Sequence, residues 1–217
     1  MKQVTRTAIV LDRSGSMQSM REEAIGAFND QLKVIQDEEE EGSRNFVSLI
    51  TFATFVDTPH FENAPAAQIP ALTEDRYTPS GGTAMLDAVG QAVDLLEASS
   101  DAEDENTSFL VVVVSDGQEN SSREWNWKTT AERLQKLQET ERWTFVYLGA
   151  NQDLTEVSKN MHIPVSNTMS FTGPQGLTGA SGPTGSHSTG LKTYFEGRKM
   201  GKRSSKSFYN PDSVDIK

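Results

Sequence analysis

The sequence contains no cysteine among its 217 residues, which excludes disulfide bridges, thiolate metal ligands and a cysteine nucleophile. It has only three histidines, and their isolated positions do not form a zinc-binding or catalytic pattern. Long hydrophobic runs are also missing. The longest, Phe109–Val114, is far shorter than the roughly 18 apolar residues of a membrane-spanning helix, and the first residues do not have the pattern of a secretory leader. We therefore expect a soluble protein that is cytoplasmic, or that belongs to a particle assembled in the cytoplasm.

Negative charge predominates, with a formal net charge of −11 at pH 7. The charge is unevenly distributed. Residues 192–217 hold seven Lys or Arg against three Asp or Glu, a net of +4, so residues 1–191 carry −15. A body this acidic repels the phosphates of nucleic acids and attracts cations. We therefore expect no nucleic-acid partner for this body.

Apolar residues alternate between short strand-like runs and stripes at three- or four-residue spacing, which are typical of amphipathic helices. The predicted strands are Thr7–Leu11, Phe46–Phe52, Ala53–Phe61, Phe109–Val114, Trp143–Leu148 and Ile163–Met169. The predicted helices cover Met17–Ile35, Leu86–Leu96, Ala131–Leu137 and Leu154–Met161. The segment after Phe52 is expected to form a tight hairpin with the strand before it. The alternation predicts a Rossmann-like, doubly wound α/β fold, with a mostly parallel central sheet and helices on both faces. The functional crevice of such a sheet lies at the carboxyl ends of its strands.

The sequence changes character after residue 171, which defines an expected domain over residues 1–171. Glycine then recurs at every third position from Gly173 to Gly185, the spacing of a collagen triple helix. Two interpretations of residues 172–191 remain open, a flexible linker and a short trimerising, collagen-like element. Residues 192–217 form a basic tail with several aromatic side chains, which either docks on the acidic body or binds something else.

Polar residues with oxygen side chains follow two predicted strands and precede one predicted helix. Asp12, Ser14 and Ser16 follow the first strand, Thr83 precedes a helix, and Asp116 follows the most apolar strand. Two carboxylates and three hydroxyls form a hard-oxygen set that suits Mg²⁺, Mn²⁺ or Ca²⁺ rather than zinc. Taken singly, each hydroxyl is also a typical helix N-cap and the last aspartate a typical turn residue. Their common place at one edge of the sheet favours a cation site.

The same residues carry a resemblance to a known family. The segments DRSGS (12–16), SGGTAMLD (80–87) and VVVVSDGQEN (111–120) resemble the von Willebrand factor type A (vWA) domain with its metal-ion-dependent adhesion site. All five positions of that family's motif are present. The resemblance covers roughly residues 3–169, including YLGANQD (147–153), a segment that is similar to small bacterial and phage-type members.

The resemblance implies one divalent cation, most simply Mg²⁺ with Mn²⁺ or Ca²⁺ as alternatives. It implies that Ser14, Ser16 and Thr83 ligate the ion through their hydroxyls. Asp12 and Asp116 would act mostly through bridging waters. The open coordination position would then receive a carboxylate oxygen from a partner protein. Such a site binds a partner and does not hydrolyse a substrate.

Four neighbouring residues are further candidates for partner binding. Arg13 and Met17 flank the first loop, and Gly82 lies in a loop whose backbone must approach the ion closely. Asp87 either braces that glycine loop or is an ordinary acid in the first turn of a helix.

Two functions from different classes are consistent with these features. The first is a non-catalytic, divalent-cation-dependent protein-binding module; the resemblance suggests a MoxR-type ATPase as one kind of associated protein. The alternative is a structural or assembly subunit, as in a phage virion or another multi-subunit particle, that uses the vWA body as scaffold and the Gly-x-y segment and basic tail for self-association. A metal-dependent hydrolase is disfavoured because no local histidine can serve as general base.

Overall fold

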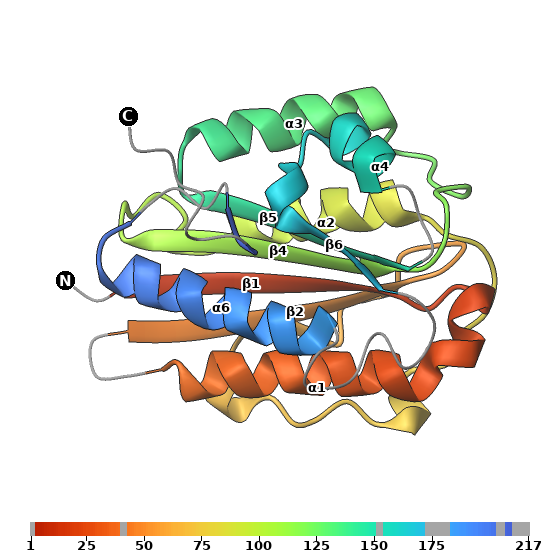
Figure 1. The fold of residues 1–217 in the computed structure, drawn as a ribbon, viewed down its shortest axis with the longest axis horizontal. Helices are drawn as coiled ribbons and strands as arrows, with labels where there is room; N and C mark the ends of the chain where they lie inside the picture. Colours follow the sequence, from red (N-terminus) through yellow and green to blue (C-terminus); the bar gives the residue numbers. More distant parts are fainter. Residues whose placement is uncertain (1–2, 40–42, 151–153, 172–182, 203–206, 210–217) are drawn as a thin grey trace.

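The computed structural model describes residues 3–39, 43–150, 154–171, 183–202 and 207–209. Six strands form a single sheet in the order β3-β2-β1-β4-β5-β6 (Figure 1). All neighbouring strands run parallel except β2 and β3, which are antiparallel. The strands are β1 (Gln3–Asp12), β2 (Ser43–Phe52), β3 (Phe61–Pro65), β4 (Thr107–Ser115), β5 (Trp143–Ala150) and β6 (Thr168–Phe171).

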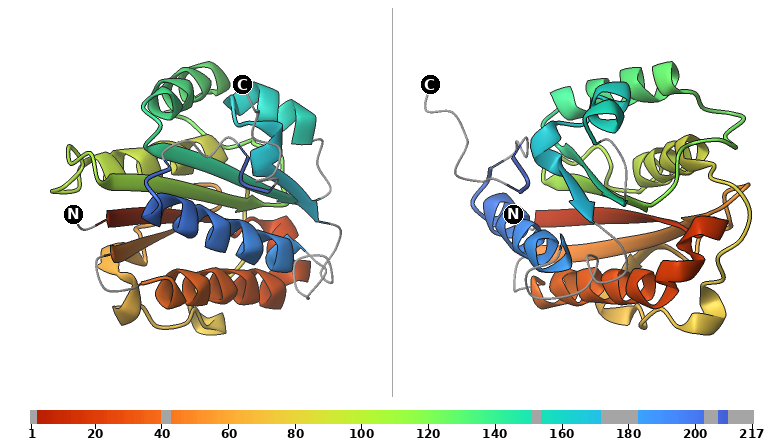
Figure 2. Two further views of the ribbon diagram at one scale, coloured as in Figure 1. Left: turned by 60° about the vertical axis from the view of Figure 1, so that its left-hand side comes forward. Right: turned by 45° about the vertical axis from the view of Figure 1, so that its right-hand side comes forward.

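Helices cover both faces of the sheet, as Figures 1 and 2 show. One face packs against α1 and α6, and the other packs against α2, α3 and α4. The α-helices are α1 (Arg21–Asp37), α2 (Met85–Glu97), α3 (Trp127–Glu139), α4 (Leu154–Met161) and α6 (Pro183–Lys199). Short 3₁₀ helices are η1 (Gly15–Met20), η2 (Ala66–Gln68), η3 (Glu74–Arg76) and η4 (Val165–Asn167). Among the described residues, no helix combines the length and apolar character that a membrane crossing requires.

The predicted doubly wound α/β fold is confirmed, and its central strands explain why. All nine residues of β4 are buried. Leu110, Val112 and Val114 pack on the side of α1, while Val111 and Val113 pack on the side of α2. A strand that is apolar on both faces is stable only between two layers of helices, because either face would otherwise be exposed to water.

The sheet register brings the ends of β1 and β4 to the same edge. Leu11 lies beside Val114, and Asp12 lies beside Phe52 at the end of β2. The chain leaves β1 at the right-hand side of Figure 1 and turns directly into η1. The loops that follow β1 and β4 are therefore neighbours.

The expected hairpin strand over Ala53–Phe61 is wrong. The chain makes only an isolated bridge between Phe52 and Val56, and β3 begins at Phe61. The intervening segment folds back on β2 instead, because the Asp57 N–H donates to the Thr51 carbonyl and the Asp57 carboxylate accepts from the Thr51 hydroxyl. Similarly, the last strand begins at Thr168 rather than at Ile163, since Pro164 and η4 occupy the intervening positions.

The predicted linker and the predicted boundary at residue 191/192 are wrong for the part of that segment that the structure describes. Residues 183–199 form one helix, α6, which runs across the boundary, while residues 172–182 lie outside the described residues. Leu191, Tyr194 and Phe195 are buried against α1 and the sheet. Their spacing is helical, and the burial of these side chains outweighs the low helix propensity of the glycines nearby. The basic tail thus docks on the body over α6, where Lys199 also forms a 3.0 Å ion pair with Glu38.

Candidate functional site

Three loops meet at the carboxyl-end edge of the sheet. The loop after β1 carries Asp12, Ser14 and Ser16, the loop before α2 carries Thr83, and the loop after β4 carries Asp116. The backbone ties the first two loops together, since the Gly15 N–H donates to the Gly81 carbonyl at 3.0 Å and the Ser80 N–H donates to the Arg13 carbonyl at 2.7 Å. The predicted juxtaposition of the three loops is therefore present in the fold.

Direct contacts join the hydroxyls to the second carboxylate. The Oγ atoms of Ser14 and Ser16 lie 3.0 Å apart. Ser16 Oγ also donates to Asp116 Oδ1 at 2.7 Å. Ser14 is buried while Ser16 is exposed, so the contact runs from the interior to the surface of the site. This arrangement leaves the outer side of the cluster open to solvent.

Asp12 supplies the inner carboxylate of the site. It is 0 % exposed and accepts hydrogen bonds from the Ser14 N–H and the Ser115 hydroxyl, both at 2.6 Å. Burial raises the pKa of Asp12 to about 6, and the negative charge of Asp116 acts in the same direction. Burial also raises the pKa of Asp116. Both carboxylates therefore lie where a nearby positive charge would stabilise their ionised forms.

Thr83 completes the set. It is buried, and its N–H donates to Asn120 Oδ1 at 2.9 Å. A Cβ atom placed on Gly117 would lie 2.9 Å from Thr83 Oγ1 and 3.6 Å from Asp12 Oδ2. Both oxygens thus approach the same point on the loop after β4. Glycine at position 117 is what allows this close approach.

Arg13 has a structural role in this arrangement. Its Nε and Nη2 atoms each lie 2.5 Å from a carboxylate oxygen of Asp57, which makes a bidentate ion pair. Its Nη1 atom donates to Ser80 Oγ at 3.2 Å. The guanidinium therefore holds the β2–β3 connection and the loop before α2 against the loop after β1, instead of extending toward a partner.

The expectation that Met17 contacts a partner is wrong. Met17 is 0 % exposed and packs in the core on the side of α1. Its place in η1 turns it inward, because the 3₁₀ turn that begins at Gly15 directs Met17 and Met20 to the same buried side. The residue anchors η1 below the site.

Gly82 and Asp87 both act within the loops of the site. The Gly82 N–H donates to Thr54 Oγ1 at 2.9 Å, and a Cβ atom at this position would lie 2.3 Å from Ser121 Oγ, so a larger residue would have to displace the Ser121 hydroxyl. Asp87 braces a different loop from the one expected. Its carboxylate accepts the backbone N–H groups of residues 123–125, at 2.8, 3.0 and 2.8 Å, and so fixes the β4–α3 connection.

Glu119 is a residue of this site that the sequence did not indicate. Its carboxylate accepts from the N–H groups of Leu86, Ser121 and Ser122, and from the Ser122 hydroxyl at 2.7 Å. It therefore joins the β4–α3 loop to the start of α2. An acidic residue in a polar loop is ordinary in a sequence, and no pattern distinguishes one that clamps backbone amides.

The chemistry of the donor set fits a hard divalent cation. Asp12, Asp116, Ser14, Ser16 and Thr83 offer oxygen ligands only, and hydroxyls with carboxylates suit Mg²⁺ or Mn²⁺. Within the described part of the chain, no Lys, Arg or His forms an ion pair with either carboxylate. In the same part, no group of three or more His, Cys, Asp or Glu could hold a metal ion, so any site here depends on the hydroxyls.

No known family model and no curated protein sequence matches this chain. Solved structures do. The pilus adhesin SpaC of Lactobacillus rhamnosus GG, in an open conformation, matches with a TM-score of 0.60 at 13 % identity, over 91 % of this chain and 30 % of the adhesin. Proximal thread matrix protein 1 from the mussel byssus matches with a TM-score of 0.59 at 15 % identity, over 89 % of this chain and 48 % of that protein.

A third structure is described as the manganese-loaded TRAP protein of Plasmodium vivax. It matches with a TM-score of 0.53 at 16 % identity, over 79 % of this chain and 69 % of that one. At such identities the likeness concerns the fold, which is the vWA-like, Rossmann-like α/β fold. The chain spans about half of the mussel protein (48 %) and about a third of the adhesin (30 %).

Proposed function

We propose that this protein is a non-catalytic, divalent-cation-dependent protein-binding module. The observation that carries the proposal is the convergence of five oxygen-bearing side chains from three loops at one solvent-facing edge of the sheet, with Ser16 Oγ 2.7 Å from Asp116 Oδ1. Structural neighbours described as an adhesin and a matrix protein support a role in protein association.

In this proposal Ser14, Ser16 and Thr83 hold Mg²⁺ or Mn²⁺ through their hydroxyls, and Asp12 and Asp116 balance its charge through water. The cation supplies an electrophilic position that binds a carboxylate oxygen of the partner. Neutral direct ligands leave the positive charge of the ion largely uncompensated, which favours an incoming Asp or Glu side chain. The manganese-loaded state of the TRAP structure supports the choice of ion.

The proposal does not require a hydrolytic step. A hydrolase would need a general base beside the reacting atoms. Three carboxylates on the loops of the site are already engaged: Asp12 and Asp116 accept hydrogen bonds from hydroxyl groups, and Glu119 accepts a hydrogen bond from a backbone N–H group. These hydrogen bonds hold the loops in position, which favours a binding role over proton exchange with a substrate.

The first test is isothermal titration of Mn²⁺ and Mg²⁺ into EDTA-treated protein. We expect saturable one-site binding in the wild type and its loss in Asp116→Asn. Because a protein with a net charge of −11 attracts cations non-specifically, the matched control is Asp75→Asn, which removes one negative charge at an exposed position in η3. Equal affinity in the two variants would overturn the metal assignment.

The second test concerns the carboxylate of the partner. With Mn²⁺ bound, the methyl protons of acetate should relax faster in NMR spectra than those of acetamide, and Asp116→Asn should abolish the difference. Acetate and acetamide differ in charge but hardly in shape. If both probes relax alike, the ion does not receive a carboxylate and the binding mechanism is wrong.

The assembly alternative receives less support from the structure. It assigned self-association to the Gly-x-y segment and the basic tail, but α6 buries Leu191 and Phe195 against the body of the same chain. These two side chains therefore do not face a second copy, while residues 172–182, which hold most of the Gly-x-y repeat, lie outside the described residues.

A further inference from the structure

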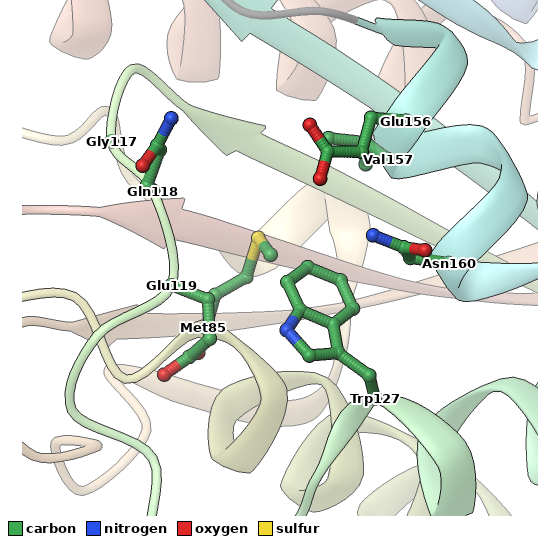
Figure 3. A pocket seen from close by; sticks show the side chains of 8 residues that line it. All are labelled: Met85, Gly117, Gln118, Glu119, Trp127, Glu156, Val157 and Asn160. Atoms are coloured by element: carbon green, nitrogen blue, oxygen red, sulfur yellow. The ribbon is translucent and has the colours of Figure 1, made fainter.

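A cavity of about 200 Å³ lies directly beside the proposed metal site (Figure 3). It opens between the loop after β4, the start of α3 and the helix α4, and its walls include Gly117, Trp127 and Glu156. Gly117 links the two sites, because it lines the cavity on one side and approaches Thr83 Oγ1 on the other.

The walls of the cavity combine one acid with an aromatic ring. In Figure 3 the carboxylate of Glu156, the amide of Asn160, the ring of Trp127 and the sulfur of Met85 surround the same space. Glu156 is exposed, and within the described residues no Lys or Arg forms an ion pair with it. Its carboxylate is thus available to a ligand.

The second acid at the cavity does not have this freedom. The carboxylate of Glu119 points away from the space in Figure 3. It accepts from the Leu86 N–H at 3.0 Å and from the Ser122 hydroxyl at 2.7 Å, which fixes it to the loop. Glu156 is therefore the acid that can recognise an occupant.

Size and charge together define the occupant. Sites for small molecules usually measure about 300–1,000 Å³, so this cavity is of a size for a single side chain. A carboxylate beside an indole ring favours a cation, because the ring attracts positive charge to its face and the carboxylate pairs with it. Glu119 on the wall of the cavity, and Asp116 directly before Gly117 in the chain, add negative charge, which disfavours an anion.

We propose that this cavity receives a lysine or arginine side chain of the same partner whose carboxylate reaches the metal. The idea of a shared partner rests on the proposed function. Because Gly117 separates the two sites, one short segment that carries an acidic and a basic residue a few positions apart can reach both. The cavity thereby selects among acidic partners, since a partner with a carboxylate but no nearby basic residue would bind the ion and leave the cavity empty.

The test uses n-butylguanidinium as a probe of the cavity in the full-length protein, in EDTA and without added metal. The indole N–H signal of Trp127 is followed by NMR, with those of Trp125 and Trp143 as internal references. We expect a saturable shift of the Trp127 signal with n-butylguanidinium and at least about fivefold weaker binding of the uncharged n-butylurea, as for an exposed ion pair.

Two variants make the test specific. Glu156→Gln should weaken binding of n-butylguanidinium about fivefold, while Glu132→Gln, which removes the same charge from an exposed position of α3, should leave it unchanged. Equal binding of n-butylguanidinium and n-butylurea, or no effect of Glu156→Gln, would overturn the proposal.

The test of the cavity can fail or succeed independently of the test of the metal site, because n-butylguanidinium is expected to bind without metal. Glu156→Gln should keep the Mn²⁺ affinity of the wild type, and a loss would place Glu156 in the metal site and overturn the proposal. If the wild type fails to bind Mn²⁺ but still binds n-butylguanidinium, the proposed function is overturned and cation binding by the cavity is supported.

Discussion

Ser16 Oγ donates a 2.7 Å hydrogen bond to Asp116 Oδ1 although the two residues are 100 positions apart in the sequence. A second bond of this kind joins Ser115 Oγ to Asp12 Oδ2, across 103 positions. The two bonds connect the ends of β1 and β4 through side chains as well as through the sheet. The oxygen cluster is therefore held in place by the protein itself, which lowers the cost of ordering it around an ion.

The first prediction concerns Ser16. Ser16→Ala removes one proposed hydroxyl ligand together with the bond to Asp116, so we expect Mn²⁺ affinity to fall at least about tenfold. Ser19→Ala in the same 3₁₀ helix is the matched control, because the Ser19 hydroxyl is exposed and its hydrogen bond to the described residues is a long one, to the Ser16 carbonyl at 3.4 Å. Isothermal titration of both variants measures the difference. Unchanged affinity in Ser16→Ala would contradict its role as a ligand.

The second prediction concerns the brace at Asp87. Asp87→Ala leaves three backbone N–H groups of the β4–α3 loop without their acceptor, and we expect the free energy of unfolding to fall by about 2–3 kcal/mol. Asp94→Ala on the same helix removes only an exposed 3.7 Å ion pair with Arg133 and should cost less than about 1 kcal/mol.

Urea unfolding of both variants provides the measurement for Asp87. The β4–α3 loop also carries Glu119 and one wall of the cavity, so hydrogen exchange at residues 123–125 should accelerate in Asp87→Ala alone. Equal losses of stability in the two variants would show that the loop does not depend on Asp87.

The third prediction is a dependence of stability on pH that arises from His187. This histidine is fully buried beside Tyr209, whose OH lies 2.8 Å from His187 Nδ1, and burial lowers its pKa from 6.5 to about 3. Below pH 6.5 the unfolded chain binds a proton at this position that the folded protein does not bind. Stability attributable to His187 is therefore lost as the pH falls, by about 2 kcal/mol between pH 6.5 and pH 5.

Urea unfolding at several pH values measures this effect. His187→Gln should show a shallower loss of stability with acid than the wild type. His162→Asn is the control, because His162 is exposed and its backbone φ of 53° suits asparagine. Parallel pH profiles for wild type and His187→Gln would show that His187 is not the responsible group.

The fourth prediction concerns α6 as part of the folded body. Leu191 is 0 % exposed against the side of the sheet covered by α1, so Leu191→Ala should lower the free energy of unfolding by about 2–5 kcal/mol. Lys192→Ala, at the exposed next position, should change it by less than about 0.5 kcal/mol. Thermal unfolding of the two variants compares them. A small effect in Leu191→Ala would mean that α6 does not stabilise the body.

The sequence predicted most of the sheet because its signals are local. A run such as Phe109–Val114 is apolar at every position and has few stable alternatives to a buried parallel strand. The common place of the five oxygen-bearing residues at one edge of the sheet was also predictable. Parallel strands place their carboxyl ends at one edge, and the loops that carry these residues lie there. The direct contacts of Ser16 with Asp116 and Ser14 agree with that expectation.

Other features were decided by contacts between distant segments. The glycine spacing before residue 185 favoured a linker or a collagen-like element, yet the chain from Pro183 forms α6, because packing of its apolar side against α1 outweighs local propensity. Met17 flanks the first loop of the site and also begins the apolar stripe of the helix predicted over Met17–Ile35. The fold decides between a partner contact and a buried position, because the turn of η1 directs Met17 into the core.

The sequence by itself therefore determined the class of the fold and the chemical nature of the candidate site, because strand hydrophobicity and residue type are properties of each segment alone. Only the tertiary structure decided which acids serve as braces and which one faces a cavity. Asp87, Glu119 and Glu156 are the same kind of group in a sequence. Their roles differ because the fold places backbone N–H groups where Asp87 and Glu119 accept hydrogen bonds from them, while it places Glu156 beside Trp127 at the cavity.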